Sequence, residues 1–225
     1  MSESTSAAPQ PSQSVPSRRR VASSLAWAVP TVVAAAAAPA EAASPPPRID
    51  RVFSVGLAST AVDGTSVGAC ATGSTRLSVT TNNSTAYYRI VNVQAGSTVT
   101  DVTASVLVEK DVVDAMARNN NPLTWTNTTT TDWSNPTREV SGTGSPVLYP
   151  NNGTQYYRYY STLKTAVPAP VSGTITLPLI GWYSNCSTTL AGVSVNGRGS
   201  AVVNGKTLVN VGTYRQLAVT PGSAG

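Results

Sequence analysis

The sequence predicts an all-β protein, an antiparallel β-sandwich with at most one short helix. Apolar residues alternate with polar or small ones over 53–57, 102–109 and 175–179, the period of two that half-buried strands require. Asn-Gly and Asp-Gly pairs, which tolerate the positive φ angles of tight turns, punctuate the chain. Because helical spacing is visible in only one stretch, these patterns favour a sheet-rich domain.

The expected elements follow in chain order. The first strand places Phe53, Val55 and Leu57 on one face, and the second does the same with every other residue of 102–108. Asp111 is positioned to cap a helix over 112–118, which the Asn-Asn-Asn-Pro run at 119–122 then stops. In the stretch 175–179, proline at position 178 has no N–H to donate, so this strand lies at a sheet edge or ends there.

Turns separate these elements. The expected turn pairs are Asp63-Gly64, Asn152-Gly153, Asn196-Gly197 and Asn204-Gly205, and the last of these predicts a two-residue hairpin between Val203 and Lys206. Short antiparallel strands joined in this way are typical of β-sandwiches that are immunoglobulin-like in the broad sense. The Cys…Trp…Cys spacing of antibody domains is missing, so only the architecture is predicted.

The composition excludes several kinds of chemistry. The 225 residues include no His, which excludes His-based catalysis and His-ligated zinc, and two Cys are too few for a four-cysteine metal site. We therefore expect no metal and no cofactor. Only 11% of the residues are charged, and apart from the arginines at 18–20 there is no basic run, so we expect no nucleic-acid partner. After Glu139 the chain holds basic residues but no acidic ones, which we interpret as a solvated surface; the alternative is an anionic partner.

The two cysteines, Cys70 and Cys186, predict a disulfide in an exported chain. Such a bridge closes a long loop and joins early strands to late ones, which favours one domain over two. The alternative is a pair of free, buried thiols.

The N-terminus has the order of a signal peptide. Arginines at 18–20 precede an apolar stretch at 25–38, and small residues around Ala42 mark the expected cleavage site. We therefore assign 1–42 to an export signal, 43–50 to a proline-rich spacer, 51–220 to a single β-sandwich domain and 221–225 to a disordered tail. The alternative is an uncleaved segment that anchors the protein to a membrane, the one membrane contact we expect.

The Ser-Arg-Arg-Arg-Val segment at 17–21 resembles a twin-arginine export signal, with Arg18 and Arg19 matching the paired arginines. Val21 and Ala22 replace the usual bulky apolar residues, so general secretory export remains the alternative. The Ala-rich stretch that follows resembles export signals of secreted proteins from high-GC Gram-positive bacteria. The resemblance covers about residues 17–45 and implies a secreted or cell-envelope location.

An aromatic run at 156–164 is the first candidate for a binding surface. In a strand, Tyr156, Arg158, Tyr160 and Lys164 share one face, where rings alternate with cations. Sugar rings and protein partners dock on such surfaces. The alternative is a structural role, with Arg158 stacked between tyrosines to stabilise the sheet.

Trp125 and Trp133 are the second candidate. They flank a polar stretch at 127–132, and exposed tryptophans on loops are the usual sugar platform of carbohydrate-binding modules. The alternative is that each ring plugs an end of the sandwich.

These observations predict a secreted or envelope-associated, non-catalytic module that binds a cell-wall glycan or another surface protein. A carbohydrate-binding module that uses the Tyr, Arg and Trp residues is the narrower alternative. A carboxylate-dependent glycan hydrolase is the second alternative, although no pair of acids stands out in the sequence.

Overall fold

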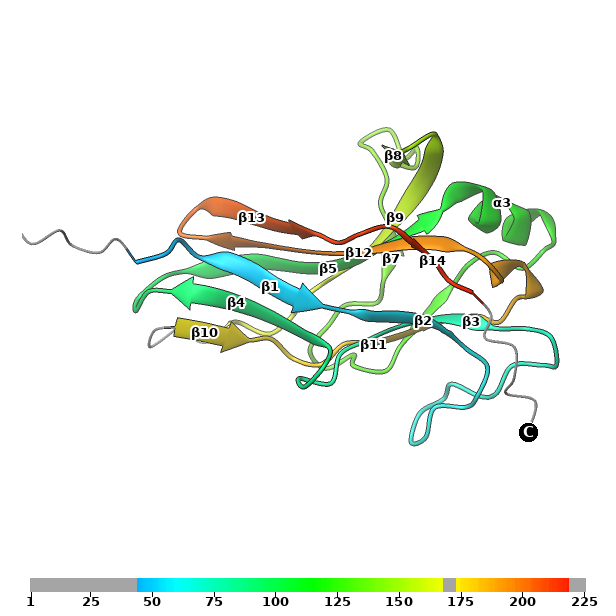
Figure 1. Cartoon of the computed structure of the whole chain (residues 1–225), viewed down its shortest axis with the longest axis horizontal. Helices are drawn as coiled ribbons and strands as arrows, with labels where there is room; N and C mark the ends of the chain where they lie inside the picture. The colour runs from blue at the N-terminus through cyan, green and yellow to red at the C-terminus, as the bar shows by residue number, and fades with distance from the viewer. Residues whose placement is uncertain (1–43, 168–172, 219–225) are drawn as a thin grey trace, which may run out of the picture. The chain divides into compact units, whose positions relative to one another are not determined.

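The computed structural model describes residues 44–167 and 173–218, which form an antiparallel β-sandwich with one α-helix in this part of the chain (Figure 1). The predicted fold class is confirmed. The predicted export signal and the tail at 221–225 lie outside the described residues. Within 44–167 and 173–218, no helix combines the length and apolar character needed to cross a membrane.

The first four strands lie in one layer of the sandwich, and the fifth is the first strand of the other. In chain order the elements are β1 (Arg48–Val52), β2 (Ser54–Ala58), β3 (Arg76–Thr80), β4 (Tyr87–Val93), β5 (Val99–Glu109), α3 (Lys110–Arg118), β6 (Trp125–Asn127), β7 (Thr137–Arg138), β8 (Leu148–Asn151), β9 (Thr154–Thr162), β10 (Gly173–Thr176), β11 (Gly181–Ser184), the 3-10 turn η1 (Thr188–Leu190), β12 (Ser194–Val203), β13 (Lys206–Val211) and β14 (Arg215–Gln216).

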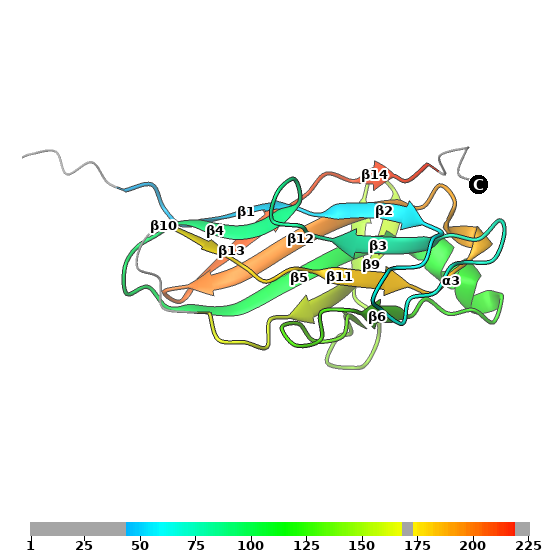
Figure 2. The same cartoon turned by 90° about the horizontal axis from the view of Figure 1, so that it is seen from below.

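One layer consists of two sheets that lie end to end, β1-β4-β10 and β2-β3-β11-β6 (Figure 2). The other layer is a seven-stranded sheet whose main path is β13-β12-β5-β9-β7, with β14 paired to β12 and β8 paired to β9. If β1 and β2, β3 and β4, and β10 and β11 are taken as three interrupted strands, the neighbours match the A-B-E and C-F-G orders of immunoglobulin-like sandwiches.

The predicted alternation is confirmed in β5, where Val102, Ala104, Val106 and Val108 all face the core. On the opposite face Ser105 is also buried, and it lines a cavity together with Tyr149 and the arginines of the neighbouring strands. The proline prediction is also confirmed, since β10 is an edge strand that ends at Thr176.

The predicted hairpin turns form where both central residues accept positive φ. Asn204 and Gly205, with φ of 50° and 76°, join β12 to β13, and Asn152 and Gly153 join β8 to β9 in the same way. Asp63 and Gly64 also lie in a turn.

Three sequence predictions need correction. Asn196 and Gly197 form no turn but lie inside β12, where the Asn196 side chain donates to the carbonyl of Gly212 and Phe53 packs closely over Gly197. The helix begins at Lys110, so Asp111 lies in its first turn instead of capping it. Finally, β1 begins at Arg48, within the predicted spacer, because these residues pair with β4.

Tyr88 joins the two layers. It lies on β4 and is 1% exposed, yet its hydroxyl reaches across the core to the carbonyls of Thr103 on β5, at 2.9 Å, and Ser200 on β12, at 2.8 Å. The ring of Trp133 stacks on it with centroids 6.2 Å apart. The strand β12 can approach this ring because residue 199 is glycine.

The predicted disulfide is present between Cys70 and Cys186, with Cα atoms 5.6 Å apart and a sequence separation of 116. It ties the long loop between β2 and β3 to the segment that follows β11. On the chain-entropy account, closing a loop of this length stabilises the fold by about 4–5 kcal/mol.

The replacement of Gly199 by alanine is expected to destabilise the protein by about 1–3 kcal/mol. A Cβ atom there lies 2.9 Å from Cζ of Tyr88, so either the ring or β12 must move. Urea unfolding measures the change. Gly56→Ala is the matched strand control, since its nearest contact is Ser78 Oγ at 3.7 Å, and it should be neutral or slightly stabilising. Equal midpoints for the two variants would show that Tyr88 does not constrain β12.

Candidate binding pocket

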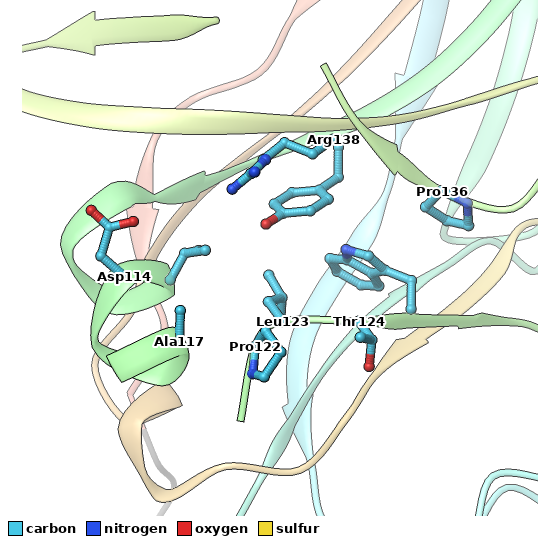
Figure 3. A pocket seen from close by; sticks show the side chains of 10 residues that line it. Asp114, Ala117, Pro122, Leu123, Thr124, Pro136 and Arg138 are labelled. Carbon is cyan, nitrogen blue, oxygen red and sulfur yellow. The ribbon is translucent and has the colours of Figure 1, made fainter. Parts of the chain in front are cut away.

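A cavity of about 410 Å³ opens where α3, the chain before β6, β7 and β9 meet. In Figure 3, Asp114 and Ala117 on α3 lie to one side of its open centre, with Arg138 above and Pro122 to Thr124 below. We call this cavity the Trp125 pocket. Its lining residues are Val113, Asp114, Ala117, Pro122, Leu123, Thr124, Trp125, Pro136, Arg138 and Tyr159.

Local structure fixes the walls of the pocket. The helix α3 buries Val113 and Met116, which leaves Asp114 and Ala117 at the side of the cavity. After the helix, the Asn121 side chain donates to the carbonyl of Cys186, so this part of the chain is held beside the disulfide.

Trp125, which is half-buried, supplies the aromatic surface, and the buried ring of Tyr159 packs behind it. Their ring centroids are 5.8 Å apart and the planes are tilted by 57°. The Trp125 indole N–H is buried and has no hydrogen-bond partner in the described part of the chain. Burial raises the pKa of Tyr159 to about 12. Its hydroxyl can donate at neutral pH, as an ordinary tyrosine hydroxyl can. The pocket thus combines flat apolar rings with hydrogen-bond donors.

Asp114 and Arg138 supply opposite charges. The Asp114 carboxylate accepts from Lys110 Nζ at 2.6 Å and from the Tyr157 hydroxyl at 3.0 Å. Burial opposes its ionisation, but these two hydrogen bonds hold the pKa of Asp114 below its ordinary value. The Arg138 guanidinium lies 5.1 Å from the centroid of the Tyr157 ring, which positions it at the rim. Charged groups are therefore held in place before any ligand arrives.

The residues predicted from the sequence do not form one site. Trp125 lines the pocket, but Trp133 is fully buried against Tyr88, so its ring is not available to a ligand and belongs to the core. Lys164 lies beyond the end of β9 and donates to the carbonyl of Thr130. Sequence reasoning missed Asp114, Arg138 and Tyr159 as pocket residues.

Tyr156, Arg158 and Tyr160 lie on the outer face of β9, as predicted, while Tyr157 and Tyr159 face the core. The three outer residues belong to a larger stack that we call the tyrosine–arginine ladder, formed by Tyr160, Arg158, Tyr149, Arg198, Tyr214 and Tyr156.

Contacts inside the ladder are ring-to-cation and ring-to-ring. The Arg158 guanidinium lies 5.4 Å from the Tyr160 ring centroid, and that of Arg198 lies 5.3 Å from Tyr149 and 5.9 Å from Tyr214. Tyr214 in turn contacts Tyr156 at 4.6 Å. Tyr156 is only 3% exposed, so much of this aromatic surface is already covered by the protein itself.

Part of the ladder could be predicted from the sequence. The Asn152-Gly153 hairpin sets Tyr149 opposite Tyr156, so the predicted turn already implies this pair. Arg198 comes from β12 and Tyr214 from the loop before β14, both distant in sequence from β9, and no local pattern signals them.

Among the described residues, no group of three or more His, Cys, Asp or Glu side chains could hold a metal ion. No protein-family model matches this chain, and neither a curated protein nor a solved structure matches it. Its function is therefore inferred from its own residues.

The Asp114→Asn variant is expected to be less stable than the wild type at neutral pH, because it loses the charge on which Lys110 and Tyr157 converge. The folded-state pKa of Asp114 lies below its ordinary value of 3.8, so this contribution is present above that pH and disappears as the pH falls through the folded pKa. Urea midpoints at about pH 7 and about pH 2 measure it, with Asp63→Asn, at an exposed turn, as control. A difference from wild type that is the same at both pH values would contradict this role.

Proposed function

We propose that this protein is a secreted or envelope-associated, non-catalytic β-sandwich that binds a carbohydrate in the Trp125 pocket. The observation that carries the proposal is the pairing of Trp125 and Tyr159 with the charged rim of Asp114 and Arg138. The volume of the Trp125 pocket, about 410 Å³, falls in the range of small-molecule pockets, roughly 300–1,000 Å³.

Sugars match this combination of groups. The C–H face of a pyranose ring is apolar and packs on an aromatic ring, while its hydroxyls need donors and acceptors around the edge. In the pocket, Asp114 accepts and Arg138 donates, and the Tyr159 hydroxyl does both. The proline and leucine side chains at 122, 123 and 136 complete the apolar wall.

Binding fits this pocket better than hydrolysis. A carboxylate-dependent glycan hydrolase needs two acids, about 5–10 Å apart, on either side of the scissile bond. Asp114 is the one acid in the lining of the pocket, and the hydrogen bonds from Lys110 and Tyr157 keep its carboxylate ionised, so it can accept from a sugar but cannot serve as the general acid.

The proposed location rests on two features. The Cys70–Cys186 disulfide is compatible with an oxidising, extracellular setting. The arginines at 18–20 and the apolar stretch after them supply the export signal in this proposal. A cell-wall glycan is then the carbohydrate that the protein meets first.

The Trp125→Ala variant is expected to lose at least tenfold in affinity for the glycan, because the platform ring is gone. Retention of the full chain on insoluble peptidoglycan, cellulose and chitin is measured first, and affinity is then determined on the polymer that retains the wild type. Trp125→Tyr keeps a ring and should restore part of the binding.

Tyr160→Ser is the matched control, since it removes a ring from the outer face of β9, away from the Trp125 pocket, and should leave retention unchanged. The proposal is wrong if the wild type binds none of the polymers, or if Trp125→Ala is retained as well as the wild type. Loss of binding in Tyr160→Ser, with Trp125→Ala unaffected, would instead place the glycan on the tyrosine–arginine ladder.

A further inference from the structure

A second cavity, of about 250 Å³, lies on the outer face of the seven-stranded sheet beside the tyrosine–arginine ladder. It is separate from the Trp125 pocket, because Arg158 and Tyr159 point to opposite faces of β9. Its lining residues are Ser105, Tyr149, Arg158, Arg198, Gly199, Ser200, Thr207 and Val209.

Ser105 is a buried polar residue without a partner. It is 1% exposed and lines this cavity, and its hydroxyl makes no hydrogen bond within the described part of the chain. Leaving a buried hydroxyl unsatisfied costs about 1–3 kcal/mol, so native proteins usually pair such groups. A group that enters the cavity can supply the missing partner.

Arg198 has donors to spare. Its Nη2 donates to the Tyr214 hydroxyl at 2.8 Å and its Nε to Asn196 Oδ1 at 3.2 Å, both neutral acceptors. A guanidinium carries five N–H groups. Among the described residues, Arg198 forms no ion pair with a carboxylate. No carboxylate among the described residues therefore neutralises its charge.

Arg158 is only partly neutralised. Its Nη1 lies 3.4 Å from Glu139 Oε2, and the same oxygen accepts a shorter bond, of 2.5 Å, from the Tyr149 hydroxyl. Glu139 does not line the cavity. The lining therefore contains two guanidinium groups and no carboxylate.

The two cations are also held in place. Arg158 packs on Tyr160 and Arg198 lies between Tyr149 and Tyr214, so neither has to be ordered when a ligand binds. A third cation, Arg51, is close enough that Arg198 adds to the effect of burial in lowering its pKa to about 10. The charged groups that line the cavity itself are both positive.

We propose that this cavity binds a small oxyanion, a carboxylate or phosphate group, with Arg198 and Arg158 donating to its oxygens and the Ser105 hydroxyl completing the set. Planar guanidinium groups match such oxyanions through paired N–H donors. At about 250 Å³ the cavity has the volume of roughly eight water molecules, enough for one charged group and the atoms next to it.

Isothermal titration of the full chain at low salt tests this site with three probes: sodium glucuronate, inorganic phosphate and neutral glucose. At least one anion should bind at least tenfold more tightly than glucose, and binding should weaken as salt is raised. Tighter binding of glucuronate identifies a carboxylate ligand, and tighter binding of phosphate identifies a phosphate ligand.

Arg198→Gln should weaken anion binding at least tenfold, and Ser105→Ala by a few fold. Val209→Asp provides a variant outside the ladder, because Val209 is 60% exposed at the edge of the cavity and an added negative charge there should also weaken binding. Arg118→Gln removes an exposed charge from α3 and should have no effect.

The proposal is overturned if neither anion binds, if glucose binds as tightly as the anions, or if Arg118→Gln weakens binding as much as Arg198→Gln. Trp125→Ala should leave the anion affinity unchanged, so failure at one cavity is distinguishable from failure at the other.

Discussion

The hydroxyl of Tyr88 determines how the two layers of the sandwich meet. It is a polar group in the centre of the core, and its acceptors are main-chain carbonyls of two adjacent strands in the opposite sheet. Burying a hydroxyl without such partners is unfavourable, so the layers must keep the separation and stagger that preserve them. Gly199 leaves room for the Tyr88 ring, and the Trp133 ring stacks on it. These contacts therefore fix how the inner faces of β5 and β12 are turned toward the opposite layer, and β9 follows because it pairs with β5.

Once β9 is fixed, its alternation distributes residues between two different environments. Tyr157 and Tyr159 turn toward the core and the end of the sandwich, where α3 and β6 add Asp114 and Trp125. Arg158 turns outward, where β12 adds Arg198 and the β8 hairpin adds Tyr149. One strand thus supplies residues to both cavities, and the composition of each depends on which neighbouring element covers that face.

Local patterns predicted the parts of the structure that local chemistry decides. Asn204-Gly205 forms its turn because positive φ is a property of those two residues, and the alternation in β5 follows from burial of one face. Asn196-Gly197 has the same local character but does not form a turn, because glycine at 197 serves the close approach of Phe53 from the other layer. Trp125 and Trp133 flank the same polar stretch of the sequence, yet Trp125 is half-buried and Trp133 is fully buried. The role of such residues is set by contacts across the sandwich, as is that of Arg198.

The disulfide has a consequence for a protein exposed to proteases. The loop that it closes, from Cys70 to Cys186, contains every lining residue of the Trp125 pocket and the long connection between β7 and β8. A single cut in that connection releases no fragment, because one cysteine lies on each side of it. The two pieces remain joined covalently and through the pairing of β5 with β9 and β12. A nicked molecule therefore keeps the parts of its pocket tethered together.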